Sequence, residues 1–340
     1  MKSPAAIPHS QILSTPDDWQ AQLRDVITSG RALLSELKLE NSPDFSALAC
    51  RDFPLKVPRD FVRRMKIGDP RDPLLLQVLA SNQELLVTPG YSDDPVGETG
   101  EANVQPGIIQ KYHGRVLLIL SGGCAINCRY CFRRHFPYSE NQNSRKEWSA
   151  AIRSIADDPQ ITEVILSGGD PLLVSDRHLA ELVEQIAAIP HVQRLRIHTR
   201  LPIVIPQRIT DTLLDAISHP RLKTVMVIHC NHAREIDSGV ADAMQRMKQR
   251  DITLLNQSVL LAGINDNIDA LAELSESLFE VDVLPYYLHL LDKVQGAAHF
   301  DVPSLRAREL MAGIRARLPG FLVPRLVQEQ PGATSKVTIA

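Results

Sequence analysis

The chain has 340 residues, of which 44% are hydrophobic and 23% charged, with a formal net charge of -3 at pH 7. These values are typical of a globular protein and exclude the strongly basic surface that binds nucleic acid or an anionic membrane. Five cysteines are too few for a disulfide framework, so we expect a reducing, cytoplasmic location. The sequence predicts neither a signal peptide nor a membrane-spanning run.

Residues 1–110 are predicted to form an N-terminal, mostly helical extension. Its short helical patterns are interrupted by prolines, and it ends in the polar stretch TPGYSDDPVGETGEANVQPG at residues 88–107. Clusters of proline, glycine and acidic residues without hydrophobic periodicity predict a long loop here.

Residues 111–320 predict six β–α units. The apolar runs RVLLIL, ITEVIL, QRLRIHT, LKTVMVIH, ITLLNQSVLL and VDVLPYYLHL alternate with amphipathic helical patterns. Such an alternation is typical of a parallel sheet covered by helices. Polar or reactive residues directly follow each run, as in barrel enzymes, where the ends of several strands meet at one mouth. We therefore predict an α/β fold, a partial (β/α)6 TIM-like barrel, followed by a short C-terminal segment at 321–340.

Three of the five cysteines lie in the segment GGCAINCRYCFRRHFPY at residues 122–138, after the first predicted strand. Their spacing is Cys124-x3-Cys128-x2-Cys131. Buried structural cysteines are one interpretation, but three of them beside several arginines are unusual. A second is a zinc site with His135 as fourth ligand, whose basic and aromatic neighbours would suit RNA. We favour a [4Fe–4S] cluster, because three thiolates leave one iron open to an exchangeable ligand.

A second polar segment, LSGGDPLL at residues 166–173, follows the second predicted strand. Gly168, Gly169 and Asp170 by themselves predict only a turn and the start of a helix. At a strand end they would share the mouth with the cysteines, and an acid suits a cationic ligand.

The cysteine spacing, with the aromatic Tyr130 before the last cysteine, resembles the radical S-adenosylmethionine (SAM) superfamily, which has the partial barrel predicted above. The resemblance implies that the open iron binds the amino and carboxylate groups of SAM. One-electron cleavage would then release a 5'-deoxyadenosyl radical that removes a substrate hydrogen. Gly168, Gly169 and Asp170 are similar to the superfamily's Gly-Gly-Glu-type segment, which implies that they meet the SAM ammonium group.

From about Pro54 onward the chain resembles the lysine 2,3-aminomutase family within that superfamily. The matching segments are CRYCFRRHFPY, SGGDPL, RIHTRLPIVIPQRIT, LLNQSVLLAGIND, YYLHLLDKVQGAAHF and TSK. The resemblance implies pyridoxal phosphate (PLP) as a further cofactor, held as an imine on Lys336. The residues alone would not select Lys336, because a lysine in the last few residues is usually a solvated tail residue.

The same resemblance implies the contacts of the substrate. Arg133 would pair with the substrate carboxylate, a task that suits its planar guanidinium, and Asp292 would receive the ε-ammonium group. His229 and Gln257 lie at strand ends and would contact SAM, although a histidine at such a position can also be structural.

Glu329 departs from the family pattern, since lysine-degrading members carry an aspartate at this place, seven residues before Lys336. The chain stops four residues after that lysine. Together with the proline-rich N-terminal region and the segment FRRHFPY, this makes the chain similar to the short proteobacterial branch of the family. That branch forms (R)-β-lysine for the modification of elongation factor P. This implies L-lysine as substrate, elongation factor P and its β-lysyl ligase as indirect partners, and flavodoxin or ferredoxin as electron donor. We expect neither nucleic acid nor a membrane as a partner.

Three other functions stay open at this point. They are a degradative lysine 2,3-aminomutase, a radical SAM enzyme without PLP, and a Cys3His zinc or RNA-binding module. The sequence also leaves open the product stereochemistry, assembly into a homo-oligomer, and whether free lysine or an attached lysyl group is the substrate.

Overall fold

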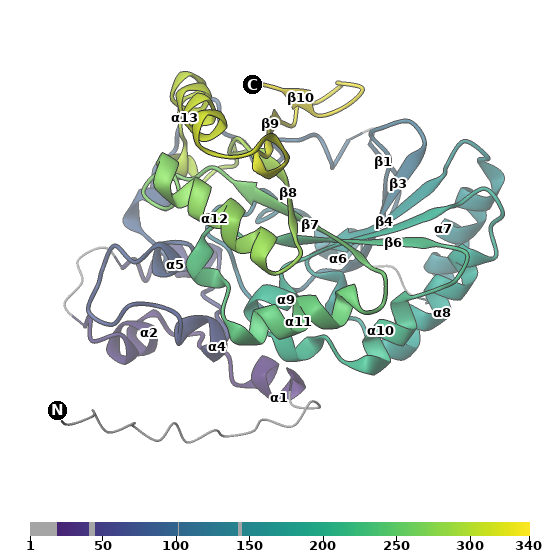
Figure 1. The fold of residues 1–340 in the computed structure, drawn as a ribbon, viewed down its shortest axis with the longest axis horizontal. Coiled ribbons are helices and arrows are strands. Elements are labelled where there is room, and N and C mark those ends of the chain that lie inside the picture. The colour runs from purple at the N-terminus through teal and green to yellow at the C-terminus, as the bar shows by residue number, and fades with distance from the viewer. Residues whose placement is uncertain (1–18, 41–44, 101, 142–144) are drawn as a thin grey trace.

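The computed structural model describes residues 19–40, 45–100, 102–141 and 145–340, so the first 18 residues of the predicted extension lie outside the described part. A single sheet of ten strands, in the order β1 to β10, organises the fold (Figure 1). Each of the six predicted strands is present, and the six run parallel to one another. They are β3 (Arg115–Ser121), β4 (Glu163–Gly168), β5 (Arg194–Thr199), β6 (Lys223–His229), β7 (Thr253–Val259) and β8 (Leu284–His289).

The C-terminal segment adds a seventh parallel strand, β9 (Arg325–Gln328), which pairs with β8. Three short antiparallel strands end the sheet on its two sides: β1 (Asn103–Gln105) and β2 (Ile108–Ile109) beside β3, and β10 (Val337–Thr338) beside β9. The sheet therefore stays open, as predicted for a partial barrel. It also crosses both proposed domain boundaries, at 110 and at 320, which stay a prediction.

Helices between the strands cover the outer face of the sheet. Figure 1 places α8, α10 and α11 along this face, whereas the C-terminal end with β10 lies on the side away from α10 and α11. These larger helices are α7 (Arg145–Asp157), α8 (Asp176–Ala187), α10 (Asp211–Ile217), α11 (Ser238–Lys248), α12 (Ile268–Glu280) and α13 (Ser304–Arg317).

Turns and loops make up most of the described part of the N-terminal extension, and its helices are short. They are α1 (Trp19–Arg24), α2 (Gly30–Glu36), α3 (Ala49–Asp52), α4 (Arg59–Val62), α5 (Pro73–Leu76) and the 3-10 turn η1 (Asn82–Leu85). Further short elements lie in the connections between strands: α6 (Tyr138–Asn141), α9 (Leu201–Val204), η2 (Pro171–Leu173), η3 (Pro206–Arg208), η4 (Ala233–Glu235), η5 (Ala298–Phe300) and η6 (Gly320–Leu322).

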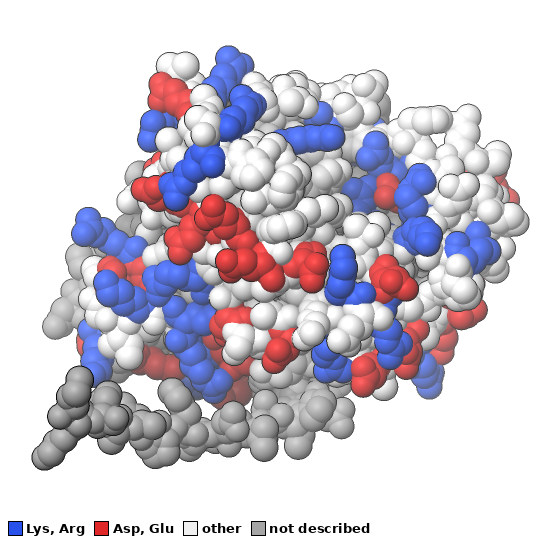
Figure 2. Space-filling view, in the orientation of Figure 1, with Lys and Arg blue, Asp and Glu red and all other residues white. Residues whose placement is uncertain are grey.

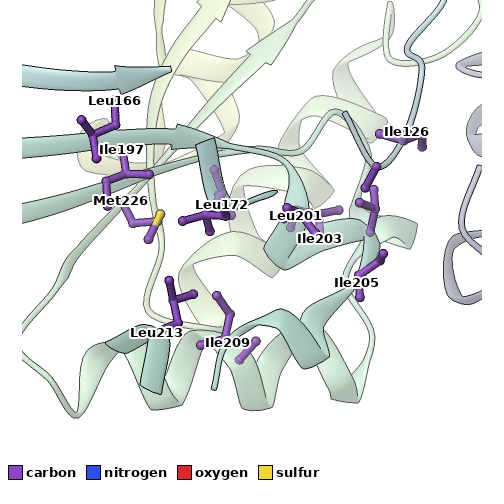
Figure 3. Packing of buried hydrophobic residues seen from close by; sticks show 14 of the residues in the cluster. Ile126, Leu166, Leu172, Ile197, Leu201, Ile203, Ile205, Ile209, Leu213 and Met226 are labelled. Carbon is purple, nitrogen blue, oxygen red and sulfur yellow. The ribbon is translucent and has the colours of Figure 1, made fainter. Parts of the chain in front are cut away.

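The core lies between the sheet and these helices. Figure 3 shows Leu166, Ile197 and Met226, from three neighbouring strands, facing Leu172 and Leu213 of the helical layer. All five side chains are almost fully buried, and each such side chain contributes about 1.5–3 kcal/mol to folding. The same cluster continues into the N-terminal extension, so this extension packs onto the barrel core.

The surface carries mixed charge. On the face drawn in Figure 2, basic and acidic side chains are interspersed, apart from a band of acidic side chains over α12. Within the described residues, no helix is both long and apolar enough to cross a membrane.

Candidate active site

The three clustered cysteines lie on one loop between β3 and α6. The thiols of Cys124, Cys128 and Cys131 are free and partly buried. The backbone N–H of Cys131 donates to the carbonyl of Cys128 at 3.0 Å, and the Lys56 ammonium donates to the carbonyl of Cys124 at 2.7 Å. Within the described residues, no three His, Cys, Asp or Glu side chains converge on a point that would suit a single ion. In an iron–sulfur cluster each thiolate binds a separate iron, and three free cysteines on one loop fit such a cluster.

His135, the fourth ligand of the zinc interpretation, turns away from the cysteines. Its Nε2 lies 3.2 Å from the carbonyl oxygen of Gln295 and 3.7 Å from a carboxylate oxygen of Asp93. The neighbouring arginines are not available to RNA either. Arg129 and Arg134 are almost fully buried and share the carboxylate of Glu84. The geometry therefore disfavours the zinc and RNA-binding alternative.

Gly168, the last residue of β4, and Gly169, the residue after it, allow the backbone of this segment to contact the backbone of the cysteine loop. Gly169 N–H donates to the carbonyl of Ser121 at 2.6 Å, and Asp170 N–H donates to the carbonyl of Gly123 at 2.8 Å. A Cβ on Gly168 would lie 2.5 Å from the Ser121 carbonyl oxygen, and one on Gly169 would lie 2.2 Å from that of Gly123. Gly168 also has a φ of +121°, which side chains rarely adopt. Only glycine fits either place.

The Asp170 carboxylate is buried and bonded to its own chain. It accepts hydrogen bonds from the Thr199 hydroxyl at 2.7 Å and from the backbone N–H groups of Leu172, Arg200 and Leu201 at 2.8–3.1 Å. Burial raises its pKa, while these hydrogen bonds oppose the shift. The carboxylate thus ties the end of β4 to that of β5, and its contact with a SAM ammonium stays a prediction.

The side chains of Tyr130 and His229 form a stacked pair beside the cysteine loop. The Tyr130 hydroxyl lies 2.9 Å from His229 Nε2, and the rings stack with centroids 5.6 Å apart. Burial lowers the pKa of His229 well below its usual range, so its imidazole is neutral at pH 7. Gln257 pairs with His229 across β6 and β7, so the structure brings these two predicted residues together at the strand ends.

Arg200 joins the cysteines to the protein interior. Its Nη1 lies 2.6 Å from Cys128 Sγ, and its Nη2 donates to Gln77 at 2.7 Å and to Glu235 at 3.0 Å. Arg200 and Glu235 are both buried. The sequence analysis did not select Arg200, although it follows β5 in the segment RIHTR, where strand-end position was a usable signal.

Arg133 lies beside the cysteine loop and is itself 8% exposed. Its Nε and Nη2 donate to the two carboxylate oxygens of Glu98 at 2.6 and 3.0 Å. Its Nη1 donates to the Ser167 hydroxyl and the Gly168 carbonyl, both at 3.1 Å. The predicted clamp for a carboxylate thus holds a carboxylate of this chain.

The C-terminal tail turns back after β9, so that β10 pairs with it and Lys336 lies opposite Glu329. The Lys336 ammonium contacts the Glu329 carboxylate, which also accepts from the Tyr112 hydroxyl and lies 3.5 Å from the Lys111 ammonium. Burial alone would raise the pKa of Glu329, but these partners, Lys336 foremost, lower it to about 2. The predicted PLP lysine is therefore docked on the barrel, because the hairpin holds it.

Asp292 faces the same region from the end of β8. Burial raises its pKa to about 7, which Lys336 opposes and Glu329 reinforces. Two histidines, His198 and His289, share this environment. Burial lowers the pKa of both, that of His289 to about 3, and Lys336 adds to each shift.

The residues around Lys336 are chemically suited to an anionic aldehyde such as PLP. The Lys111 ammonium lies 3.5 Å from the Glu329 carboxylate. The Arg115 guanidinium lies 5.2 Å from the ring centroid of Tyr112, the residue next to Lys111. The buried Nε2 of His198 has no hydrogen-bond partner within the described residues, so a bound group could supply one. Three cations and an unsatisfied imidazole fit a phosphate-bearing cofactor.

Comparison with known proteins agrees with this geometry. The family model of the radical SAM superfamily matches residues 118–275. The L-lysine 2,3-aminomutase of Escherichia coli K12 is 48% identical over 97% of this chain and 97% of that protein. The enzyme of that name from Haemophilus influenzae is 46% identical over 98% and 99% of the two chains, and that from Clostridium subterminale 33% over 95% and 78%. The chain therefore belongs to the lysine 2,3-aminomutase family of the radical SAM superfamily.

Proposed function

We propose that this chain is an L-lysine 2,3-aminomutase, which moves the α-amino group of L-lysine to C3. One observation carries the proposal. A row of contacts, Arg133–Glu98–Lys111–Glu329–Lys336, runs without interruption from the cysteine loop to the C-terminal lysine. It brings a carboxylate-binding group, an ammonium-binding group and a reactive amine to one side of the sheet.

Membership of the superfamily implies a [4Fe–4S] cluster and SAM, which Cys124, Cys128 and Cys131 would hold. We add PLP, which Lys336 would hold. When bound, these groups would supply radical chemistry for removing hydrogen from C3 and electron delocalisation for the shift of nitrogen from C2 to C3.

The protein's own side chains would bind and orient the substrate. Arg133 would hold the carboxylate, while Asp292 and Glu329 would receive the ε-ammonium group. Fixing both charged ends leaves C3 facing the cluster side. Tyr130 and the neutral His229 would line this side and keep out water, which protects a reactive radical.

For the physiological role, we propose (R)-β-lysine for the modification of elongation factor P in the cytoplasm, with flavodoxin or ferredoxin as electron donor. Elongation factor P and its β-lysyl ligase would then be indirect partners. The high identity to short relatives over nearly their full length supports this branch. A degradative enzyme is the second candidate, and a deletion strain separates them. A deletion that slows growth in the wild type but causes no further defect in a strain already lacking elongation factor P supports our proposal.

Anaerobic reconstitution tests the activity. The protein is loaded with iron and sulfide, supplied with SAM, PLP, reductant and L-lysine, and the product is analysed on a chiral column. We expect (R)-β-lysine, and none when SAM is left out. Formation without PLP would support the PLP-independent alternative. If the loaded protein cleaves SAM yet forms no β-lysine, the proposed activity is wrong.

A further inference from the structure

The guanidinium of Arg133 is occupied almost completely by groups of this chain. Arg133 has five N–H donors, and four hydrogen bonds engage them: two to Glu98, one to Ser167 and one to Gly168. The edge that grips Glu98 is the bidentate one, which any other carboxylate would also prefer. While Glu98 stays, a second carboxylate could take at most a single N–H.

Glu98 is held in this place by a turn that hydrogen bonds to Asp94 stabilise. The Asp94 carboxylate accepts hydrogen bonds from the backbone N–H of Glu98 at 2.9 Å and of Thr99 at 2.8 Å, and from the Thr99 hydroxyl at 2.6 Å. Gly97, between Asp94 and Glu98, adopts a φ of +68°, and this turn of the backbone directs the Glu98 side chain inward. The Arg133 and Glu98 side chains are only 7% and 6% exposed. The contact is therefore a feature of the fold and no surface ion pair.

Charge also argues against two carboxylates on Arg133 at once. Burial alone would raise the pKa of Glu98, but Arg133 and Lys111 outweigh it and keep the pKa below its usual range, so Glu98 is ionised. A neutral Arg133–Glu98 pair offers a substrate carboxylate little attraction, and two buried carboxylates side by side repel. For Arg133 to bind the substrate carboxylate, Glu98 has to leave.

Lys111 provides the place to which Glu98 can move. Its ammonium already lies 3.3 Å from a Glu98 carboxylate oxygen. A small rotation of the Glu98 side chain would break the contact with Arg133 and keep that with Lys111. The released carboxylate would then stay paired, which avoids the cost of a lone buried charge.

We propose that Glu98 occupies the place of the substrate carboxylate on Arg133, and that L-lysine binds by exchanging with it. This inference rests on the proposed function. It makes Glu98 a specificity-determining residue. A ligand with a carboxylate can replace Glu98, whereas a diamine without one cannot, and so leaves the internal pair closed.

Ligand binding to a Glu98→Gln variant tests the exchange. The anaerobic holoenzyme, with SAM and PLP but no reductant, is titrated with L-lysine and with cadaverine, the diamine that lacks the carboxylate. We expect Glu98→Gln to bind L-lysine about tenfold or more tightly than the wild type, because the weaker amide competitor is easier to displace. Cadaverine binding should be unchanged. L-lysine should also raise the melting temperature of the variant more than that of the wild type.

A weaker or unchanged affinity for L-lysine in Glu98→Gln overturns the proposal, since Glu98 would then orient Arg133. Glu329→Gln is the matched control and should weaken both ligands, because both carry the terminal ammonium. Should Glu98→Gln fail to fold, Asp94→Asn, which loosens the turn, is expected to shift L-lysine affinity in the same direction and decides instead. Failure of the proposed function looks different: the wild type would then show no preference for L-lysine over cadaverine.

Discussion

The two ends of the candidate site are built by different means. At the cluster end, the cysteine loop rests on the backbone of the loop after β4 and on the buried network of Arg200 and Glu235. At the substrate end, the contacts are ion pairs between side chains of distant segments: Glu98, Lys111 and the C-terminal hairpin with Glu329 and Lys336. The first end is part of the hydrophobic core, and the second joins separate segments of the chain through largely buried ion pairs.

This difference separates two kinds of mutational effect. At the cluster end, the backbone contacts that only glycine permits and the Arg200–Glu235 pair lie within the core and cannot be altered without disturbing it. Side-chain pairs on a loop and a tail can change while the barrel stays folded. Changes at the cluster end should therefore affect stability and metal content together, whereas changes at the substrate end should affect ligand binding more than stability.

The largest expected effect is at the cluster end. Cys128→Ala removes one of three thiolates, so we expect reconstituted protein to lose nearly all iron and acid-labile sulfide and to form no β-lysine. Iron and sulfide analysis with electron paramagnetic resonance checks this. Cys50→Ala, which removes a free, half-buried thiol outside the loop, is the control and should keep the cluster. A Cys128→Ala protein with full iron content would contradict the assignment.

The matching change at the substrate end is Lys336→Ala. We expect it to abolish covalently bound PLP and to reduce β-lysine formation by roughly 10³-fold or more, because the amine that holds the cofactor is gone. Absorption spectra and activity measure this. Iron content should stay unchanged, and the free energy of unfolding should fall by no more than about 1–2 kcal/mol. Lys223→Ala, at an exposed position, is the control. Persistent covalent PLP in Lys336→Ala would assign the cofactor to another lysine.

The next largest expected effect is on the free energy of unfolding, which a substitution at the cluster end should lower. Arg200→Met leaves the buried Glu235 without its cationic partner, so we expect the apoprotein to lose about 3–5 kcal/mol in denaturant unfolding. Arg246→Met breaks an exposed pair with Asp211 and should cost less than about 1 kcal/mol. Equal unfolding midpoints for Arg200→Met and the wild type would mean that the cluster end is not part of the stable core.

The smallest expected effect is a pH dependence at the substrate end. Because the pKa of Asp292 is raised to about 7, this group is largely a neutral acid below pH 7 and a carboxylate above it. Only the carboxylate pairs with the ε-ammonium group, so L-lysine affinity should rise about tenfold between pH 6 and 8 and then level off. Titration calorimetry across this range measures it. Asp292→Asn should remove the step, and a flat wild-type profile would argue against the pairing.

The sequence predicted the barrel strands and the mouth because apolar runs followed by polar residues carry a strong signal. It missed β9, since the four residues of RLVQ are too short to show periodicity. Glu98 could not be foreseen, because a proline- and glycine-rich loop does not encode which side chain turns inward. The end of the same predicted loop forms β1. Asp170 has contacts that only the folded turn reveals, since capping geometry depends on neighbouring strands.

The hairpin of β9 and β10 has a consequence for solubility. An open sheet risks joining the edge of another chain, and short edge strands limit this because they offer few unpaired backbone groups. β10, with only Val337 and Thr338, covers the longer β9, whose Leu326 and Val327 are buried. A shortened protein that lacks β10 would thus expose the unpaired backbone groups of β9. We expect it to aggregate more readily than any variant that merely replaces Lys336.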